Sequence, residues 1–243
     1  MRVIVTGSHG AVAPYVIGEL RSRGHDVVVF DREKVDINSY DEIYNFIKKN
    51  RVDQFFHIAT GPLEWLEYIV IACQQLNVKV IYTSSVSVFS EQGTGPYTVD
   101  SIPDATDDYG MYKRKGEEIV KKNPNNLIVR LGWQIGYRKG SNNMMDFLIR
   151  QEEEKGYIEA SDTWYPSCSF IMDTAKTLVD LARNRTGLYL LNANKKFSFY
   201  HICRGLAHVF GYQWDIREVN NITRDDRMYD QRVKIKNINA IYK

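Results

Sequence analysis

The segment RVIVTGSHGAVA, residues 2–13, decides how this chain folds. Its first residues, Arg2–Val5, form a short β-branched run that predicts a buried strand. Gly7 then permits a tight turn, and Gly10 permits a phosphate group to approach the backbone closely. A helix is expected to follow, and its first N–H groups are free to bind that phosphate. The segment therefore predicts a strand, a turn and a helix that bind the pyrophosphate of a dinucleotide.

An acidic residue follows at the spacing that such a site requires. Asp31 comes directly after a second predicted strand, Val27–Phe30, where its carboxylate can bind the ribose hydroxyls of the adenosine. A carboxylate about 4 Å from the 2′-phosphate of NADP would cost roughly 4 kcal/mol per charge pair at an effective dielectric constant of about 20. This repulsion favours NAD. The neighbouring Arg32 can pair with the 2′-phosphate, so NADP stays open as the alternative.

Strand-like and helix-like segments alternate through the first half of the chain. Ser39 and Glu42 have the spacing of a capping box, which marks the start of one of these helices. The alternation predicts an α/β fold of the Rossmann type, a doubly wound parallel sheet covered by helices on both faces. Further strands are predicted at Gln54–Ile58, Val78–Tyr82 and Leu127–Arg130, and helices at Ala11–Arg23, Tyr40–Asn50, Leu63–Leu76 and Tyr109–Lys122.

The rhythm of the sequence changes after about Gly132. Helix-like segments at Asn143–Lys155, Asp173–Arg183 and Ser198–Phe210 are separated by short, irregular stretches. We expect a dinucleotide-binding domain over residues 1–132 and a smaller substrate-binding lobe over residues 133–243, interleaved with the first and packed against it.

The composition argues against several other classes of protein. The 32 basic and 30 acidic residues are interspersed and leave a net charge of +2, which does not favour nucleic acid as a partner. No segment approaches the roughly 20 apolar residues of a membrane-spanning helix, and no signal peptide precedes the first strand. We therefore expect a cytoplasmic protein without membrane contact. Cys73, Cys168 and Cys203 lack metal-ligand spacing, so free thiols and no metal site are expected.

Three side chains point to acid–base chemistry on a carbonyl group. Tyr109 and Lys113 lie four positions apart, on one face of a predicted helix. A tyrosine has an ordinary pKa of about 10, and a nearby ammonium together with a positive nicotinamide ring favours its ionised form. Proton delivery to a developing alkoxide then becomes feasible. Ser85, at the carboxyl edge of the sheet, can donate a hydrogen bond to the substrate oxygen, and Ser84 is a close rival for this role.

Four motifs resemble those of a known family: TGSHGAVA at residues 6–13, YTSSVSVF at 82–89, YGMYKRKGE at 109–117 and LIVRLGWQIG at 127–136. They resemble the extended short-chain dehydrogenase/reductase superfamily, most of all its dTDP-4-dehydrorhamnose reductase group, and the likeness covers nearly the whole chain. The resemblance implies a catalytic set of Ser85, Tyr109 and Lys113. It also implies cofactor contacts, and with their neighbours the predicted contacts are Gly7, His9, Gly10, Ala11, Asp31, Arg32, Asp36, Ile37, Ala59, Thr60, Tyr109 and Lys113.

The chain departs from this family at three places. Only Thr60–Pro62 connects the third strand to the next helix, where relatives have a longer stretch that lines the active site. Val86–Ser87 stand where related dehydratases carry an Asp-Glu pair, which argues against dehydration. Cys168–Ser169 stand where many relatives have a basic residue for the substrate diphosphate, a role that Arg138 and Lys139 can take.

Three functional hypotheses remain. The leading one is an NAD(P)H-dependent reductase of a 4-keto-6-deoxy sugar nucleotide, in which Tyr109 supplies a proton and Ser85 holds the ketone oxygen. The second is a nucleotide-sugar 4-epimerase that keeps its NAD bound. The third is a non-catalytic regulatory or scaffold protein that retains the dinucleotide fold, and the presence of all three catalytic positions argues against it. The expected partner is a sugar-nucleotide substrate, and a homodimer stays open.

Overall fold

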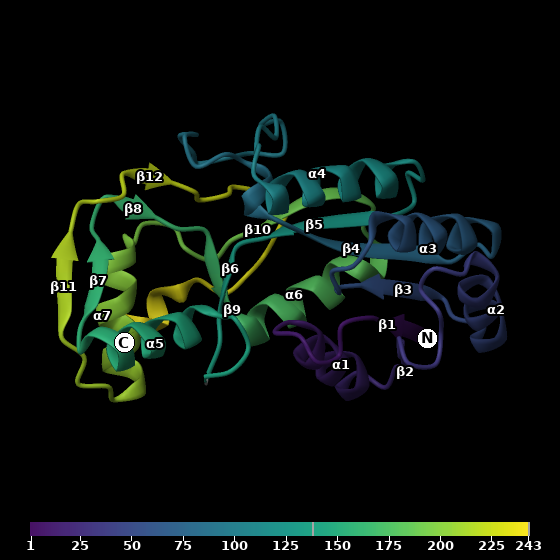
Figure 1. Cartoon of the computed structure of the whole chain (residues 1–243), viewed down its shortest axis with the longest axis horizontal. Coiled ribbons are helices and arrows are strands. Elements are labelled where there is room, and N and C mark those ends of the chain that lie inside the picture. The colour runs from purple at the N-terminus through teal and green to yellow at the C-terminus, as the bar shows by residue number, and fades with distance from the viewer. Residues whose placement is uncertain (138, 243) are drawn as a thin grey trace.

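Six parallel strands form the central sheet of the computed structural model, which describes residues 1–137 and 139–242 (Figure 1). The strand order is β10-β5-β4-β3-β1-β2. Because this order reverses between β1 and β3, ligands are expected at the carboxyl ends of the strands beside that reversal. The predicted Rossmann-type fold is confirmed. The strands are β1 (Arg2–Val5), β2 (Asp26–Val29), β3 (Gln54–His57), β4 (Lys79–Ser85), β5 (Leu127–Leu131) and β10 (Gly187–Leu191).

Helices cover both faces of this sheet, as predicted (Figure 1). On one face, α1 (Ala13–Ser22) and α6 (Ile171–Asn184) pack against each other over a continuous apolar cluster. On the other face, α2 (Tyr40–Asn50), α3 (Leu63–Gln75) and α4 (Asp108–Lys121) lie in a row over a second cluster. The strands are therefore buried on both sides, which explains their nearly unbroken apolar sequences.

Two differences from the predicted elements have a physical cause. β4 continues to Ser85, beyond the predicted end at Tyr82, because it stays paired with β5 through its polar residues. No strand was predicted at 187–191, yet β10 pairs in parallel with β5, and Leu191 lies beside Leu131. Since α6 and β10 come after residue 132 and still belong to the sheet layer, the chain returns to this layer after entering the second predicted domain.

A smaller lobe lies beside the sheet, to its left in Figure 1. It contains the predicted helices as α5 (Met144–Lys155) and α7 (Phe199–Phe210), around a core in which Cys168 and Cys203 are buried. No helix within residues 1–137 and 139–242 is long and apolar enough to cross a membrane. The remaining elements are the paired strands β6 (Trp133–Ile135) with β9 (Cys168–Phe170), β7 (Ile158–Ser161) with β11 (Ile216–Val219), β8 (Trp164–Tyr165) with β12 (Arg224–Asp225), and the 3-10 turns η1 (Val86–Val88) and η2 (Ile238–Tyr242).

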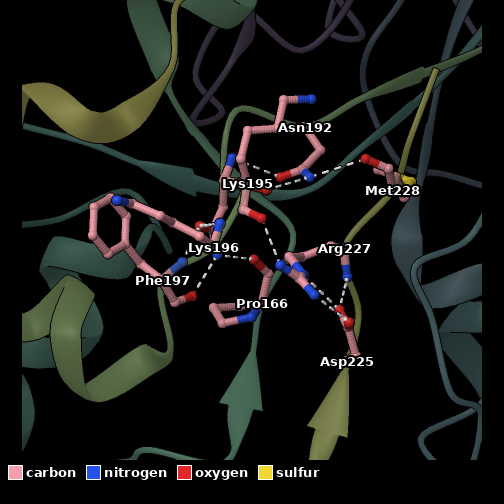
Figure 2. Close-up of polar contacts among 9 residues, drawn as sticks. Pro166, Asn192, Lys195, Lys196, Phe197, Asp225, Arg227 and Met228 are labelled. Carbon is pink, nitrogen blue, oxygen red and sulfur yellow. Dashed lines mark hydrogen bonds and ion pairs between the residues drawn. The ribbon is translucent and has the colours of Figure 1, made fainter. Parts of the chain in front are cut away.

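Two buried asparagines that follow β10 join the lobe to the sheet, and Figure 2 shows the contacts of the first of them, Asn192. Asn192 donates from Nδ2 to the carbonyl oxygen of Met228 at 3.0 Å. Asn194 donates from Nδ2 to the carbonyl oxygens of Pro166 at 2.9 Å and Phe197 at 2.7 Å. Because an unpaired buried amide is costly, these bonds fix the segments before α7 and after β12 against the end of β10.

A buried ion pair holds α4 on the sheet. Arg130 of β5 donates from Nε and Nη2 to the two carboxylate oxygens of Glu117, both at 2.8 Å, and each side chain is 1% exposed. Ser84 of β4 donates to the same carboxylate at 2.6 Å. Beside this ion pair, α4 packs closely on Tyr82 of β4. Only glycine fits at position 116, because a Cβ there would lie 2.3 Å from the hydroxyl oxygen of Tyr82. The face of α4 that carries Gly116 and Glu117 is thereby fixed against β4 and β5.

We expect Glu117→Ala to lower the free energy of unfolding by about 3–5 kcal/mol, because it leaves the Arg130 guanidinium buried without a counter-charge. Urea unfolding followed by circular dichroism measures the loss. The matched control is Glu118→Ala, whose side chain is 73% exposed on the same helix and which should shift stability by no more than about 0.5 kcal/mol. Equal effects of the two substitutions would contradict the role assigned to the pair.

Candidate active site

The glycine-rich turn after β1 packs directly against the end of β3. Gly7 has a φ of +80°, and a Cβ there would lie 3.0 Å from the backbone nitrogen of Ala59. The buried hydroxyl of Thr6 accepts hydrogen bonds from the backbone N–H groups of Ile58 at 3.0 Å and Ala59 at 3.1 Å. Gly10 donates its N–H to the carbonyl oxygen of Gly7 at 2.8 Å and closes the turn. The turn therefore needs glycine at position 7 for both its conformation and its space.

The N-terminus of α1 offers free backbone donors beside this turn. In the part of the chain that the structure describes, the amides of Ala11 and Val12 donate to no acceptor. Pro14 in the first turn has no N–H to satisfy. His9 lies exposed at the rim, with Nδ1 3.4 Å from the Ser8 hydroxyl. Free amides at a helix N-terminus beside a tight turn fit the pyrophosphate of a dinucleotide.

The acidic residue at the end of β2 is ionised and partly exposed. Asp31 forms an ion pair with Lys34 at 2.9 Å, and its side chain is 37% exposed. The hydrogen bond from Lys34, followed by one from the backbone of Glu33, lowers the pKa of Asp31. The carboxylate is therefore an acceptor at neutral pH, as binding of two ribose hydroxyls requires.

Asp36 and Ile37 take part in the start of α2. The Asp36 carboxylate accepts a hydrogen bond from the backbone of Asn38 at 2.9 Å, while its N–H donates to the Glu42 carboxylate at 2.8 Å. Glu42 in turn donates its N–H to the Ser39 hydroxyl at 3.3 Å. Ser39 thus caps the helix as predicted, but the Glu42 side chain reaches Asp36 and not Ser39. Ile37 packs against the adjacent apolar cluster. As cofactor contacts, both residues stay predictions.

The short connection Thr60–Pro62 is held from two sides. Arg32 donates from its guanidinium to the carbonyl oxygen of Thr60, and its Cζ lies 4.5 Å from the centroid of the Trp65 ring. Tyr112 of α4 accepts the N–H of Gly61 on its hydroxyl oxygen at 3.2 Å. The sequence analysis did not single out Tyr112 or Trp65, because nothing in the sequence links α4 or α3 to this connection. Side chains from β2's end and from α4 therefore hold this connection on both sides.

Lys113 is buried between the sheet and three tyrosine rings. It is 3% exposed, and its Nζ donates to the carbonyl oxygen of Thr83 at 2.9 Å. The Nζ lies 5.0, 5.8 and 5.5 Å from the ring centroids of Tyr82, Tyr109 and Tyr112. Burial lowers the pKa of Lys113 to about 8, against a raising effect of Glu117. An ammonium near its titration point thus lies beside the predicted proton donor.

Tyr109 is the exposed member of the predicted set. Its side chain lies on α4 and is 48% exposed, so a ligand can reach it. Burial of part of the phenol raises its pKa, and a hydrogen bond to Ser85 opposes that rise. The phenol is therefore protonated at neutral pH, the form that a proton donor needs.

The two adjacent serines at the end of β4 have different surroundings. Ser84 is buried and donates its proton to Glu117. Ser85 is only partly buried, accepts the N–H of Ser87 at 3.1 Å and donates to the Ser87 hydroxyl at 3.1 Å. Ser84 is thus engaged in holding α4, whereas Ser85 has a hydroxyl that can turn toward a ligand. Ser85 remains the predicted partner of Tyr109.

The basic residues proposed for the substrate diphosphate find little support. Lys139 forms an ion pair with Glu153 of α5, and Arg138 lies outside the described residues. Arg232 and Arg227, two other arginines near the lobe, are paired with Asp230 and with Asp225, respectively.

Comparison with known proteins gives matches in sequence and in structure. Residues 64–232, more than half of the chain, match the family model described as the RmlD substrate binding domain. The chain is 22% identical to the spore coat polysaccharide biosynthesis protein SpsK from Bacillus subtilis (strain 168) over 237 residues, covering 90% of this chain and 82% of that protein.

Solved structures share the fold along nearly the entire chain. A dTDP-4-dehydrorhamnose reductase from Bacillus anthracis in complex with NADP aligns with a TM-score of 0.84 at 18% identity, covering 97% of this chain and 95% of that one. A UDP-glucose 4-epimerase from Thermus thermophilus in complex with NAD aligns with a TM-score of 0.75 at 16% identity, covering 94% of this chain and 90% of that one. At these identities the likeness shows the common fold.

Burial makes the stability of the protein depend on the charge of Lys113. Its pKa is about 8 in the folded protein and about 10.4 in an unfolded chain, so below the folded value the fold holds a buried ammonium at a cost. We expect Lys113→Met to raise the free energy of unfolding at pH 7 by about 2–3 kcal/mol. This gain should fade as the pH rises from about 8 to about 10.4, where the lysine is neutral in both states.

Urea unfolding at a series of pH values measures this difference between the variant and the wild type. Lys115→Met, an exposed lysine on the same helix, is the control and should show no such pH dependence. If the gain in the free energy of unfolding of Lys113→Met stays constant from pH 7 to 11, the pKa of Lys113 is not lowered by burial.

Proposed function

Because the chain belongs to the RmlD substrate binding domain family, we propose that it is an NAD(P)H-dependent reductase of a 4-keto-6-deoxy sugar nucleotide. The observation that carries this proposal is the position of Tyr109, Lys113 and Ser85. The buried Lys113 lies beside the exposed phenol of Tyr109, and Ser85 ends β4, the strand against which their helix packs. A proton donor, a nearby positive charge and a carbonyl-binding hydroxyl thus meet at the carboxyl edge of the sheet. The Bacillus anthracis neighbour is a dTDP-4-dehydrorhamnose reductase, which agrees with this proposal.

The reaction adds a hydride and a proton across the substrate carbonyl. The nicotinamide cofactor supplies the hydride to the ketone carbon when it is bound. Tyr109 gives its phenol proton to the oxygen as negative charge develops there. Ser85 donates a hydrogen bond to the same oxygen, which requires that its proton turn away from Ser87. The product is the alcohol, and the phenolate that is left takes a proton from water.

Lys113 makes this proton transfer feasible at neutral pH. With a pKa of about 8, it is mostly charged at pH 7 and stabilises the phenolate of Tyr109 by charge. Its bond to the carbonyl oxygen of Thr83 fixes the ammonium in place, so the stabilising charge does not need to reorganise during the reaction. Burial alone would leave Tyr109 a weak acid, because its pKa is raised.

The adenosine end of the site favours NAD over NADP. Asp31 carries its charge where the second ribose hydroxyl would lie, and a 2′-phosphate there would be repelled. Arg32 could offset that repulsion, but its guanidinium already binds Thr60 and covers Trp65. Lys34, which forms an ion pair with Asp31, weakens the repulsion of a 2′-phosphate without removing it. Of the structurally similar proteins, the Bacillus anthracis reductase was solved with NADP and the Thermus thermophilus epimerase with NAD, so this comparison supports a nicotinamide dinucleotide but does not choose between the two.

A 4-epimerase is the second candidate, favoured by the preference for NAD at Asp31 and by the epimerase among the structural neighbours. The same three residues would then first remove a proton from a sugar hydroxyl and later return it. An epimerase keeps its cofactor oxidised and bound between turnovers, whereas a reductase releases it. A non-catalytic role would not need a buried Lys113 at a cost in stability. A homodimer and a cytoplasmic location stay predictions.

Tyr109→Phe should lower the rate of turnover by roughly 10²- to 10⁴-fold, because the general acid is lost while the ring remains. Oxidation of NADH and NADPH with a dTDP-4-keto-6-deoxy sugar, followed by absorbance, measures the rate, and cofactor fluorescence measures the Kd for NADH. That Kd should stay close to the wild-type value. The control is Tyr229→Phe, which alters a 54% exposed tyrosine of the C-terminal segment. Unchanged turnover in Tyr109→Phe would rule out the assigned acid.

Asp31→Asn should reduce the preference for NADH over NADPH, measured as the ratio of the two Kd values. In the wild type we expect the Kd for NADPH to exceed that for NADH by roughly 10-fold or more, through repulsion of the 2′-phosphate. The substitution removes the charge and keeps the shape, so the ratio should approach one. Glu33→Gln removes a neighbouring exposed carboxylate and serves as the control. A wild type that binds NADPH more tightly would show that Arg32 outweighs Asp31.

A further inference from the structure

One peptide group in the connection after β3 is held from both sides. The carbonyl oxygen of Thr60 and the N–H of Gly61 belong to the same planar unit, and in a trans peptide they point in opposite directions. Arg32 donates from Nη2 to the carbonyl oxygen, and the N–H donates to the hydroxyl oxygen of Tyr112 at 3.2 Å. The guanidinium that follows β2 and the phenol of α4 therefore fix the orientation of this peptide.

Packing on Trp65 of α3 removes much of the freedom that is left. A Cβ at Gly61 would lie 2.7 Å from Cε3 of Trp65, so glycine lets the peptide lie directly on the indole ring. The same ring carries the guanidinium of Arg32, whose Cζ lies 4.5 Å from the ring centroid. Trp65 is itself 1% exposed, so its ring is held by the core. We call this unit, formed by Arg32, Thr60, Gly61, Trp65 and Tyr112, the peptide clamp.

The peptide clamp lies next to the turn that is predicted to bind the pyrophosphate. Ala59, the residue before the clamped peptide, packs on Gly7, where a Cβ would lie 3.0 Å from the Ala59 nitrogen. Arg32 directly follows Asp31, the predicted partner of the adenosine ribose. Thr60 is exposed. The clamp therefore fixes the backbone beside the predicted positions of the adenosine and the pyrophosphate.

Tyr112 joins this clamp to the catalytic helix. It directly precedes Lys113, and the centroid of its ring lies 5.5 Å from Nζ of that lysine. The hydroxyl and the ring of Tyr112 thus have separate partners, the N–H of Gly61 and the ammonium of Lys113. A substitution that removes only the hydroxyl therefore releases the clamped peptide and leaves the ring beside the lysine.

We propose that the Tyr112 hydroxyl is a positioning group for the cofactor. It acts through the Thr60–Gly61 peptide, whose fixed orientation strengthens the binding of the adenosine and pyrophosphate half of the dinucleotide. Tyr112 itself does not touch the reacting atoms. This inference rests on the proposed function only in taking a nicotinamide dinucleotide as the ligand.

Tyr112→Phe tests this role in binding measurements without any sugar substrate. We expect the Kd for NADH to rise about 3- to 10-fold, the loss of one hydrogen bond. The Kd for ADP-ribose should rise by the same factor, because the clamp acts on the half that both ligands share. Titration calorimetry gives each Kd together with the number of binding sites, which should stay at the wild-type value in a folded variant. The control, Tyr68→Phe, alters a half-buried tyrosine of α3 that packs against Tyr40 and should leave both Kd values unchanged.

A double-mutant cycle tests whether Tyr112 acts through the shared peptide. Arg32→Met removes the donor on the carbonyl side of the same peptide. Once one side is released, the peptide can turn, so loss of the second bond should add little. The combined variant should therefore lose less affinity for ADP-ribose than the product of the two separate losses. A combined loss equal to that product would mean that the two residues act independently, and would overturn the clamp.

Turnover separates this inference from the proposed function. With a dTDP-4-keto-6-deoxy sugar, Tyr112→Phe should raise the KM for NADH by the factor found for its Kd and change kcat by less than about 2-fold. A larger loss of affinity for NADH than for ADP-ribose would place the effect at Lys113 and overturn the proposed role, as would an unchanged Kd for ADP-ribose. A wild type that binds neither ligand would overturn both this inference and the proposed function. If the protein shows the expected binding but reduces no sugar nucleotide, the reductase is wrong and the role of Tyr112 is supported.

Discussion

The buried carboxylate of Glu117 is the constraint on which the candidate site depends. It accepts hydrogen bonds from Nε and Nη2 of Arg130 and from the hydroxyl of Ser84, so α4 cannot shift along β4 and β5 without unpairing buried charge. Lys113 and Tyr109 lie four and eight positions earlier on the same helix, so this anchor also sets their height above the sheet. Glu117 raises the pKa of Lys113 against the effect of burial, and thereby keeps that lysine close to charged at neutral pH.

A second constraint fixes the opposite wall of the site. The contact between Gly7 and Ala59 leaves no space for a side chain, so the turn after β1 and the end of β3 hold each other in place. The connection that follows is short, and Arg32 and Tyr112 tie it to the adenosine end and to α4. Side chains from both sides therefore hold this short connection in place. Both constraints act at the carboxyl edge of the sheet, where ligands bind in doubly wound folds.

Much of this arrangement could be predicted from sequence because it is local. The turn at Gly7 and the alternation of strands and helices follow from spacing and periodicity alone. The strand β10 could not be foreseen, since its place depends on pairing with β5, far away in sequence. The choice between Ser84 and Ser85 depends on which side of β4 faces Glu117, and one residue of register reverses it.

The most direct test follows deuterium from the cofactor into the sugar. The protein is incubated with NADH that carries deuterium at the transferable C4 position and with a dTDP-4-keto-6-deoxy sugar, and the product is analysed by mass spectrometry and NMR. The account predicts one deuterium at C4 of the product alcohol and one NADH consumed for each product formed. A product without deuterium and without NADH consumption, together with inversion at C4 when a nucleotide sugar that carries a C4 hydroxyl is supplied with NAD instead, would contradict the reductase and identify an epimerase.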